Sequence, residues 1–117
     1  MNQYLLLLHE NPADSAQITP AQMQEIVARH QAWARSLAER QLLAGGEKLS
    51  DDGGRRLRLQ NGRPLASDGP YAEAHDIVGG YYVIKAETDA QAEALAAECP
   101  HLSGTQWIEL RRIDALM

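Results

Sequence analysis

The spacing of apolar residues along the chain marks strands and helices in alternation. Residues 3–9 form a near-continuous apolar run, which predicts a strand buried on both faces. A helix is expected over residues 20–40, because Thr19 is a good N-cap, Pro20 suits the first helical position and Gln22 completes a capping box. Its apolar stripe follows at helical spacing and comprises Met23, Ile26, Val27, His30, Trp33, Ala34 and Leu37.

The middle of the chain is typical of strands joined by a tight hairpin. A strand is expected within residues 42–49. Residues 56–60 and 63–67 are expected to pair around Asn61-Gly62, which is the preferred sequence for a type I′ turn. Pro64 lacks an N–H donor, which places the returning strand at a sheet edge.

The rest of the chain adds a strand, a helix and a strand. Residues 77–84 are rich in aromatic and β-branched side chains, which favour a strand. Thr88 and Gln91 make a second capping box before a helix that Pro100 ends, and a last strand covers residues 105–113. This order predicts an α+β domain of the ferredoxin-like, split βαβ type, with an antiparallel sheet, both helices on one face and an extra β-hairpin.

The sheet face without helices needs a cover of its own. In the last strand Ile108 and Leu110 point to one face, and Trp107, Glu109 and Arg111 point to the other. A tryptophan among charged residues on the helix-free face indicates a protein partner, and the simplest partner is a second copy of the chain. We therefore expect a homodimer.

Composition narrows the class of protein. With 117 residues and a hydrophobic fraction of 44%, the chain suits a single domain over residues 1–117. The net charge of −5 argues against nucleic acid or an anionic membrane as partner. The single Cys99 argues against a disulfide scaffold, and the leucines near the start are too few for a signal peptide or a membrane span, so a cytoplasmic location is expected.

Asp68 heads the candidate catalytic residues. A turn alone would account for Asp68 with Gly69 and Pro70, since aspartate bonds its own backbone, glycine allows positive φ and proline fixes a turn. In the functional interpretation, Asp68 is the principal polar residue of an acid–base site, assisted by His75 or His9. Both interpretations stay open at this stage.

Four further residues are candidate ligand contacts. Tyr71 and Glu73 share the short loop that follows Asp68. Glu109 and Arg111 lie two apart on one strand face, where they can form an ion bridge at a dimer interface or hold a polar or anionic ligand.

The remaining histidines and arginines allow more than one interpretation. His9 shares a strand face with Leu5 and Leu7, and the sequence does not decide whether that face meets a ligand. His30 lies on an apolar stripe, which favours a hydrogen-bonded core histidine over a ligand contact. No ligand spacing supports a metal site, and no cofactor is expected. The arginines of the hairpin are interpreted as a solvated edge rather than a nucleic-acid site: Arg55, Arg56, Arg58 and Arg63.

Several motifs, in order along nearly the whole chain, resemble the DGPF branch of the YciI-related proteins. They are Gly-Gly-Glu-Lys-Leu at 45–49, Asn-Gly-Arg-Pro-Leu at 61–65, Asp-Gly-Pro-Tyr-Ala-Glu at 68–73, Gly-Gly-Tyr-Tyr at 79–82 and Glu-Leu-Arg at 109–111. The resemblance implies a dimeric α/β barrel in which two ferredoxin-like sheets face each other. It implies no established activity for most members, lyase activity on hydroxylated aromatic rings for some, and association with transcription proteins for others.

Two departures from the family pattern bear on mechanism. The YciI branch has a His–Asp pair whose histidine lies early in the first helix, where residues 23–26 of this chain are Met-Gln-Glu-Ile. Residues 74–76 are Ala-His-Asp where DGPF proteins usually have Thr-Lys-Glu. We therefore expect a domain that binds an unidentified small molecule, with lyase-like acid–base chemistry as one reading. A non-catalytic binding or regulatory module, or a structural dimer, is the alternative.

Overall fold

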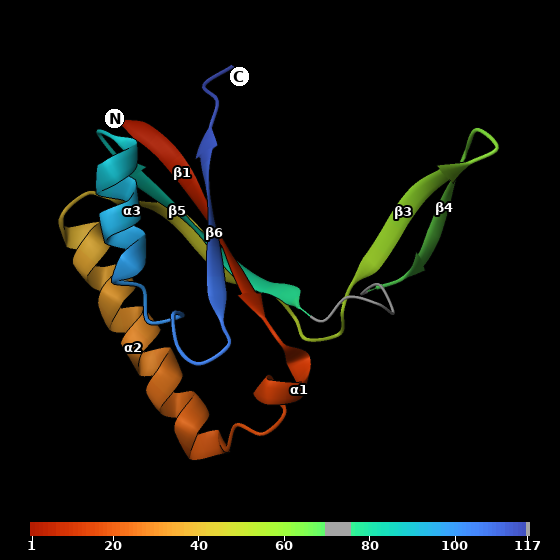
Figure 1. The fold of residues 1–117 in the computed structure, drawn as a ribbon, viewed down its shortest axis with the longest axis horizontal. Helices are drawn as coiled ribbons and strands as arrows, with labels where there is room; N and C mark the ends of the chain where they lie inside the picture. The colour runs from red at the N-terminus through yellow and green to blue at the C-terminus, as the bar shows by residue number, and fades with distance from the viewer. Residues whose placement is uncertain (70–75, 117) are drawn as a thin grey trace.

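The computed structural model, described over residues 1–69 and 76–116, is built on a four-stranded antiparallel sheet (Figure 1). The strand order is β2-β5-β1-β6. β5 therefore lies between β1 and β2, and β1 lies between β5 and β6, which interleaves the two strand–helix–strand units. This confirms the predicted α+β class, the antiparallel sheet and the extra hairpin. Pairing with a second copy stays a prediction. The sheet consists of β1 (Asn2–Glu10), β2 (Leu43–Lys48), β5 (Ile77–Ala86) and β6 (Trp107–Ile113).

Two long helices lie on one side of this sheet: α2 (Pro20–Glu39) and α3 (Asp89–Ala97). The predicted capping box of α2 is confirmed, with Gln22 N donating to Thr19 Oγ1 and Thr19 N donating to Gln22 Oε1. At α3 only half of the predicted box forms, because the side chain of Gln91 accepts from Glu87 N instead of Thr88 N. The short helix α1 (Pro12–Ser15), capped by Asn11, was not predicted. None of the helices in the described part of the chain is long and apolar enough to cross a membrane.

The core fills the space between the sheet and the helices. Tyr4, Leu6 and Leu8 of β1 are buried there, whereas Leu5 and Leu7 on the opposite face are only half-buried. The prediction that β1 is buried on both faces is therefore wrong for the single chain, because no element within residues 1–69 and 76–116 covers the second face. The buried hydrophobic residues are Tyr4, Leu6, Leu8, Leu37, Leu42, Ile84, Ala86, Ala92, Leu95, Ala96 and Cys99.

The helix-free side of the sheet, called the open face below, carries a mixed apolar and charged surface. Strand register places Leu5 beside Val83 and Arg111, and Leu7 beside Tyr81 and Glu109. The predicted division of β6 is confirmed, since Ile108 and Leu110 pack against the core on the helix side. The open face comprises Gln3, Leu5, Leu7, His9, Glu47, Tyr81, Val83, Lys85, Trp107, Glu109, Arg111 and Ile113.

The hairpin forms a separate two-stranded sheet that projects from the body (Figure 1). It consists of β3 (Arg55–Gln60) and β4 (Arg63–Asp68), and is called the arm below. The predicted type I′ turn agrees with the positive φ of 52° at Asn61 and 79° at Gly62. Pro64 lies at a sheet edge, as predicted, because each strand of a two-stranded sheet is an edge.

Candidate functional site

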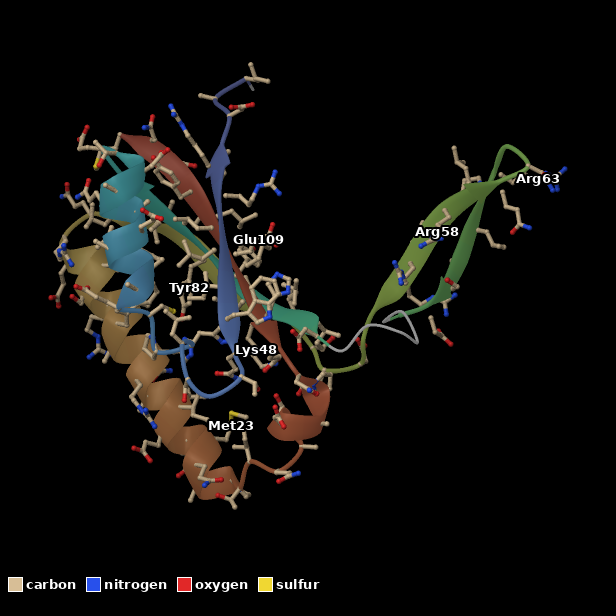
Figure 2. All side chains as sticks on the ribbon, in the orientation of Figure 1. Met23, Lys48, Arg58, Arg63, Tyr82 and Glu109 are labelled. Carbon is tan, nitrogen blue, oxygen red and sulfur yellow. The ribbon has the colours of Figure 1, made fainter. Side chains whose placement is uncertain are left out.

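A cavity of about 550 Å³ lies between the N-terminal half of α2 and the adjoining end of the sheet. Met23 of α2, Lys48 of β2 and Tyr82 of β5 reach it from three different elements (Figure 2). One wall is apolar because α2 contributes Met23, Ile26 and Val27 there. These side chains are not buried in the core, whereas Leu37, farther along the helix, is fully buried. Polar groups line the rest, so the helix-side cavity has the mixed lining of a small-molecule site.

A hydrogen bond of 2.8 Å joins His30 Nδ1 to the Tyr82 hydroxyl at the cavity wall. The two rings are nearly parallel, and Trp33 packs edge-on against Tyr82 with ring centroids 5.0 Å apart. The Tyr82 ring lies close across Gly46 of β2, where a Cβ would come within 2.7 Å of Tyr82 Cδ1. The hydroxyl is therefore held in place by a glycine on one strand and two side chains on α2.

Burial keeps both members of this pair uncharged at neutral pH. It lowers the pKa of His30 below its ordinary 6.5, and the electrostatic effects of the neighbouring His101 and Arg29 act in the same direction. Burial also raises the pKa of Tyr82 to about 12. A neutral imidazole and a protonated hydroxyl can donate or accept according to the tautomer of His30.

The second ring nitrogen of His30 is open to the cavity. Within residues 1–69 and 76–116, His30 Nε2 has no hydrogen-bond partner, and the one enclosed side-chain nitrogen or oxygen that lacks a partner is Trp33 Nε1. Nε2 is therefore not fully enclosed by protein atoms, and His30 is one of the residues that line the cavity. A molecule in the cavity can exchange a hydrogen with Nε2 while Nδ1 stays bonded to Tyr82.

His101 is a second imidazole beside His30, and a backbone contact fixes its orientation. It is buried, and its Nε2 lies 2.8 Å from the carbonyl oxygen of His9. A carbonyl only accepts, so Nε2 carries the hydrogen, and in neutral His101 the lone pair is on Nδ1. Its ring stands edge-on to that of His30, with centroids 6.4 Å apart.

Glu10 places a carboxylate on the same cavity. Ser15 Oγ donates to Glu10 Oε2 at 3.1 Å, and the other oxygen lies over Gly79. A Cβ at Gly79 would be 1.9 Å from Glu10 Oε1, so the absence of a side chain there makes room for the carboxylate. The register between β1 and β5 shifts at this point, from Leu8 opposite Gly80 to His9 opposite Val78, which leaves Gly79 as the extra residue of a bulge.

The open face holds a second cluster of polar side chains. His9 Nε2 lies 3.2 Å from Glu109 Oε1, and the imidazole stacks on Trp107 with ring centroids 3.9 Å apart. Arg111 donates to Glu109 at 3.4 Å, and Trp107 Nε1 donates to Asp76 at 2.9 Å. Three of the residues proposed from the sequence, His9, Glu109 and Arg111, are therefore brought together on one surface.

The other proposed residues are not joined to that cluster by any described contact. Asp68 lies at the base of the arm, where its exposed carboxylate is paired with Arg55 of the neighbouring strand. In the described part of the chain, no histidine nitrogen lies within hydrogen-bonding distance of Asp68. Tyr71, Glu73 and His75 lie outside the described residues, so their roles stay predictions.

The helix-side cavity was not identified from the sequence. His30 is hydrogen-bonded and partly buried, as expected, yet it also lines the cavity. The best signal in the sequence was the pair Gly79-Gly80 just before Tyr81-Tyr82, because glycine within a strand marks the close approach of another group. No group of three or more His, Cys, Asp or Glu side chains among the described residues is arranged to hold a metal ion.

Comparison with known families identifies the chain. Residues 2–113, from β1 to the end of β6, match the YCII-related domain (YCII). The chain belongs to the YCII family. This confirms the resemblance to YciI-related proteins, whereas the DGPF branch stays a prediction. A comparison with curated proteins gave no match. Family membership fixes no reaction for a YCII domain, so its function must be argued from the geometry of the site.

Proposed function

We propose that this YCII domain binds a small molecule in the helix-side cavity, and that the His30–Tyr82 pair exchanges a proton with it. The observation that carries the proposal is the 2.8 Å hydrogen bond between His30 Nδ1 and the Tyr82 hydroxyl, beside an Nε2 open to the cavity. The perturbed pKa values of both residues support it, because such shifts in a concave site are typical of functional groups.

The lining indicates the chemical class of the ligand. Met23, Ile26 and Val27 offer an apolar wall for a hydrocarbon or aromatic body. The Glu10 carboxylate only accepts hydrogen bonds and repels anions, so it favours a ligand with a hydroxyl or amine group. We infer a small, mostly apolar alcohol, phenol or amine.

The two tautomers of His30 give the pair both directions of proton transfer. When Nδ1–H donates to the Tyr82 oxygen, Nε2 has a lone pair and acts as a base toward the ligand. When the Tyr82 hydroxyl donates to Nδ1, Nε2–H acts as an acid, and as it leaves, the Tyr82 proton moves to Nδ1 so that the negative charge comes to the Tyr82 oxygen. This is the acid–base chemistry that a lyase requires.

A ligand screen with matched variants tests the proposal. A panel of phenols, alcohols and amines is screened by thermal shift, and hits are titrated calorimetrically against the wild type, Tyr82→Phe and His30→Asn. We expect His30→Asn to weaken binding by about fivefold or more, since it removes a hydrogen bond to the ligand of about 1 kcal/mol. Tyr82→Phe should also weaken binding, because His30 loses the partner that sets its tautomer. His9→Gln, on the open face, is the control and should leave the affinity unchanged. Affinity that is unaffected by both cavity variants would refute the site.

Following bound hits by NMR separates an enzyme from a binding module. Conversion of a hit that is lost in His30→Asn supports catalysis. Binding without conversion of any hit supports the non-catalytic or regulatory alternative.

The open-face cluster supports a second candidate function. The 3.2 Å contact of His9 with Glu109 is a histidine–carboxylate pair, which is suited to acid–base chemistry, and Arg111 can bind an anionic group beside it. Asp68, Tyr71, Glu73 and His75 remain proposed members of this site. Hits whose affinity falls in His9→Gln and Asp68→Asn, with no change in Tyr82→Phe, would move the site to the open face.

A further inference from the structure

A second cavity, of about 540 Å³, lies beside the helix-side cavity and is called the polar cavity below. It is formed by α1, the first turns of α2 and the loop that joins α3 to β6, which lie at the same end of the molecule (Figure 1). Four residues line both cavities: Ser15, Ile18, Ile26 and Gln106. The two cavities are therefore adjacent, and these four side chains form the boundary between them.

Two helix-capping residues offer amide donors to the polar cavity. The side-chain oxygen of Asn11 accepts from Ala13 N at 2.9 Å. The side-chain oxygen of Gln22 accepts from Thr19 N, also at 2.9 Å. Because each amide oxygen faces a backbone N–H, the NH₂ group of the same amide points away from that N–H, and in the described part of the chain neither NH₂ group has a partner. Both residues line the polar cavity and can donate to a molecule bound there.

The charged side chains of the polar cavity already have partners. Asp14 Oδ2 accepts from Thr105 Oγ1 at 2.6 Å, which ties α1 to the loop before β6. Glu25 forms an ion pair with Arg29 at 3.4 Å, one helical turn away. Carboxylates outnumber cationic side chains across the two linings, so an anion is repelled, and a cation would have to compete with Arg29 for Glu25. The polar cavity therefore favours a neutral group.

The side-chain amide of Gln106 lies at the boundary between the two cavities. Its backbone N–H donates to Ser103 O at 3.1 Å, so a turn holds the residue in place. The side chain is half-buried, and within residues 1–69 and 76–116 neither its oxygen nor its NH₂ group has a hydrogen-bond partner. An amide that is withdrawn from water without a partner costs free energy. A ligand hydroxyl can satisfy either end of this amide, because a hydroxyl both donates and accepts.

We propose that one ligand spans both cavities, with its phenol or alcohol group beside His30 and a neutral, polyhydroxylated group such as a sugar in the polar cavity. The inference rests on the proposed function and extends it from the reacting group to the rest of the ligand. Ile18 and Ile26 contact the carbon skeleton between the two parts, and Gln106 binds a hydroxyl at the junction. One ligand is favoured over two, because a phenol alone leaves the polar amides unpaired and a sugar alone leaves the apolar wall in water.

Three probes with the same head group test the span: para-methoxyphenol, para-hydroxyphenyl β-glucoside and para-cyclohexyloxyphenol. Each carries a para-alkoxyphenol, and they differ in having no ring, a hydroxylated ring or a hydrocarbon ring as the tail. Calorimetric titration gives the Kd of each probe. We expect the glucoside to bind about tenfold more tightly than para-methoxyphenol, since its tail forms new hydrogen bonds in the polar cavity. It should also bind more tightly than the cyclohexyl ether.

Three variants each remove one amide donor while the helix caps are kept. Asn11→Asp and Gln22→Glu retain the capping oxygen, because aspartate is a good N-cap and glutamate completes a capping box as glutamine does. Gln106→Met keeps the length of the side chain and removes its amide. In each variant the ratio of the Kd of para-methoxyphenol to that of the glucoside should fall about fivefold.

The ratio isolates the contribution of the tail, since an effect on the shared head group cancels. Gln24→Met is the matched control, because Gln24 lies on α2 outside both linings, and it should retain the wild-type ratio. Circular dichroism establishes that each variant is folded. In NMR spectra of the glucoside complex, we expect contacts of the aromatic protons with Met23 and of the sugar protons with the side-chain amide of Gln106.

Several results would overturn the spanning ligand. Equal Kd values for the glucoside and para-methoxyphenol would exclude it, and if para-methoxyphenol still binds more weakly to His30→Asn, the proposed function stands alone. A cyclohexyl ether that binds as tightly as the glucoside would exclude the polyhydroxylated class. A ratio unchanged in all three variants would place the sugar outside the polar cavity. Probes whose affinity is the same in His30→Asn would refute the proposed function, and the inference with it, and so would absence of binding by all three at millimolar concentration refute the inference.

Discussion

Gly79→Ala probes the link between the β5 bulge and the Glu10 carboxylate. The new methyl group would fall 1.9 Å from Glu10 Oε1 and 2.6 Å from Cδ, so the carboxylate must move. Movement breaks the 3.1 Å bond from Ser15 Oγ and takes the acceptor away from its place in the helix-side cavity. The end of a glutamate side chain is flexible, so the backbone has no need to shift.

Two opposing free-energy terms set the expected magnitude. Loss of a partly exposed hydrogen bond to a charged group costs about 1.5 kcal/mol. Replacing a strand glycine by alanine stabilises by about 0.7 kcal/mol, because the unfolded chain loses freedom. The free energy of unfolding should therefore fall by about 1 kcal/mol or less. In a Glu10→Ala background the clash is absent, and the same change should stabilise by about 0.7 kcal/mol.

Urea unfolding of the four proteins of this double-mutant cycle measures the coupling, which we expect to be about 1.5 kcal/mol. Gly45→Ala is the matched control, since a Cβ there meets nothing within 4 Å. It should have the same effect with and without Glu10. A cycle in which Gly79→Ala changes stability equally in both backgrounds would refute the proposed contact between the bulge and the carboxylate.

Three further changes test the other groups of the cavity. Burial lowers the pKa of His30, so that as the pH falls below the ordinary 6.5 the unfolded chain takes up a proton before the native state does, and the free energy of unfolding decreases. His30→Asn should therefore lose less stability than the wild type between about pH 7 and pH 5 in urea unfolding. Equal losses in the two proteins would contradict this. Because the pKa of Tyr82 is raised to about 12, Tyr82→Phe should remove a tyrosine that ionises late in an alkaline absorbance titration, and an unchanged late phase would argue against its burial. Gly46→Ala places a Cβ 2.7 Å from Tyr82 Cδ1 and 2.9 Å from the Tyr81 carbonyl oxygen. It should therefore lower the free energy of unfolding by about 1–3 kcal/mol and alter the fluorescence of Trp33, which packs on Tyr82. An unchanged stability would show that the Tyr82 ring can move aside.

The elements that the sequence predicted well are those whose cause is local. The capping box of Thr19 and Gln22 and the turn at Asn61-Gly62 depend on residues at most three positions apart. Burial of β1 on both faces was predicted wrongly because the run of leucines does not reveal what covers each face. Leu5 and Leu7 are only half-buried, because the described part of the chain places nothing over that face.

The candidate site was less accessible from the sequence because its contacts are distant along the chain. His30 and Tyr82 are 52 positions apart, and His9 and Glu109 are 100 apart. Strand parity placed Glu109 and Arg111 on the same face, and only the register with β1 added His9 to them. The bulge at Gly79, which makes room for Glu10, depends on a one-residue shift of register that no local pattern records.

The arm also has a consequence for how the chain folds. Residues 49–79 interrupt what would otherwise be a simple hairpin of β2 with β5, whose pairing ends at Lys48 and Gly80. Closing an excursion of 31 residues instead of a four-residue turn costs about 1.8 kcal/mol in chain entropy. Shortening it to a tight turn should therefore speed folding and raise the stability of the isolated chain. The native length of this excursion therefore slows folding and lowers the stability of the isolated chain.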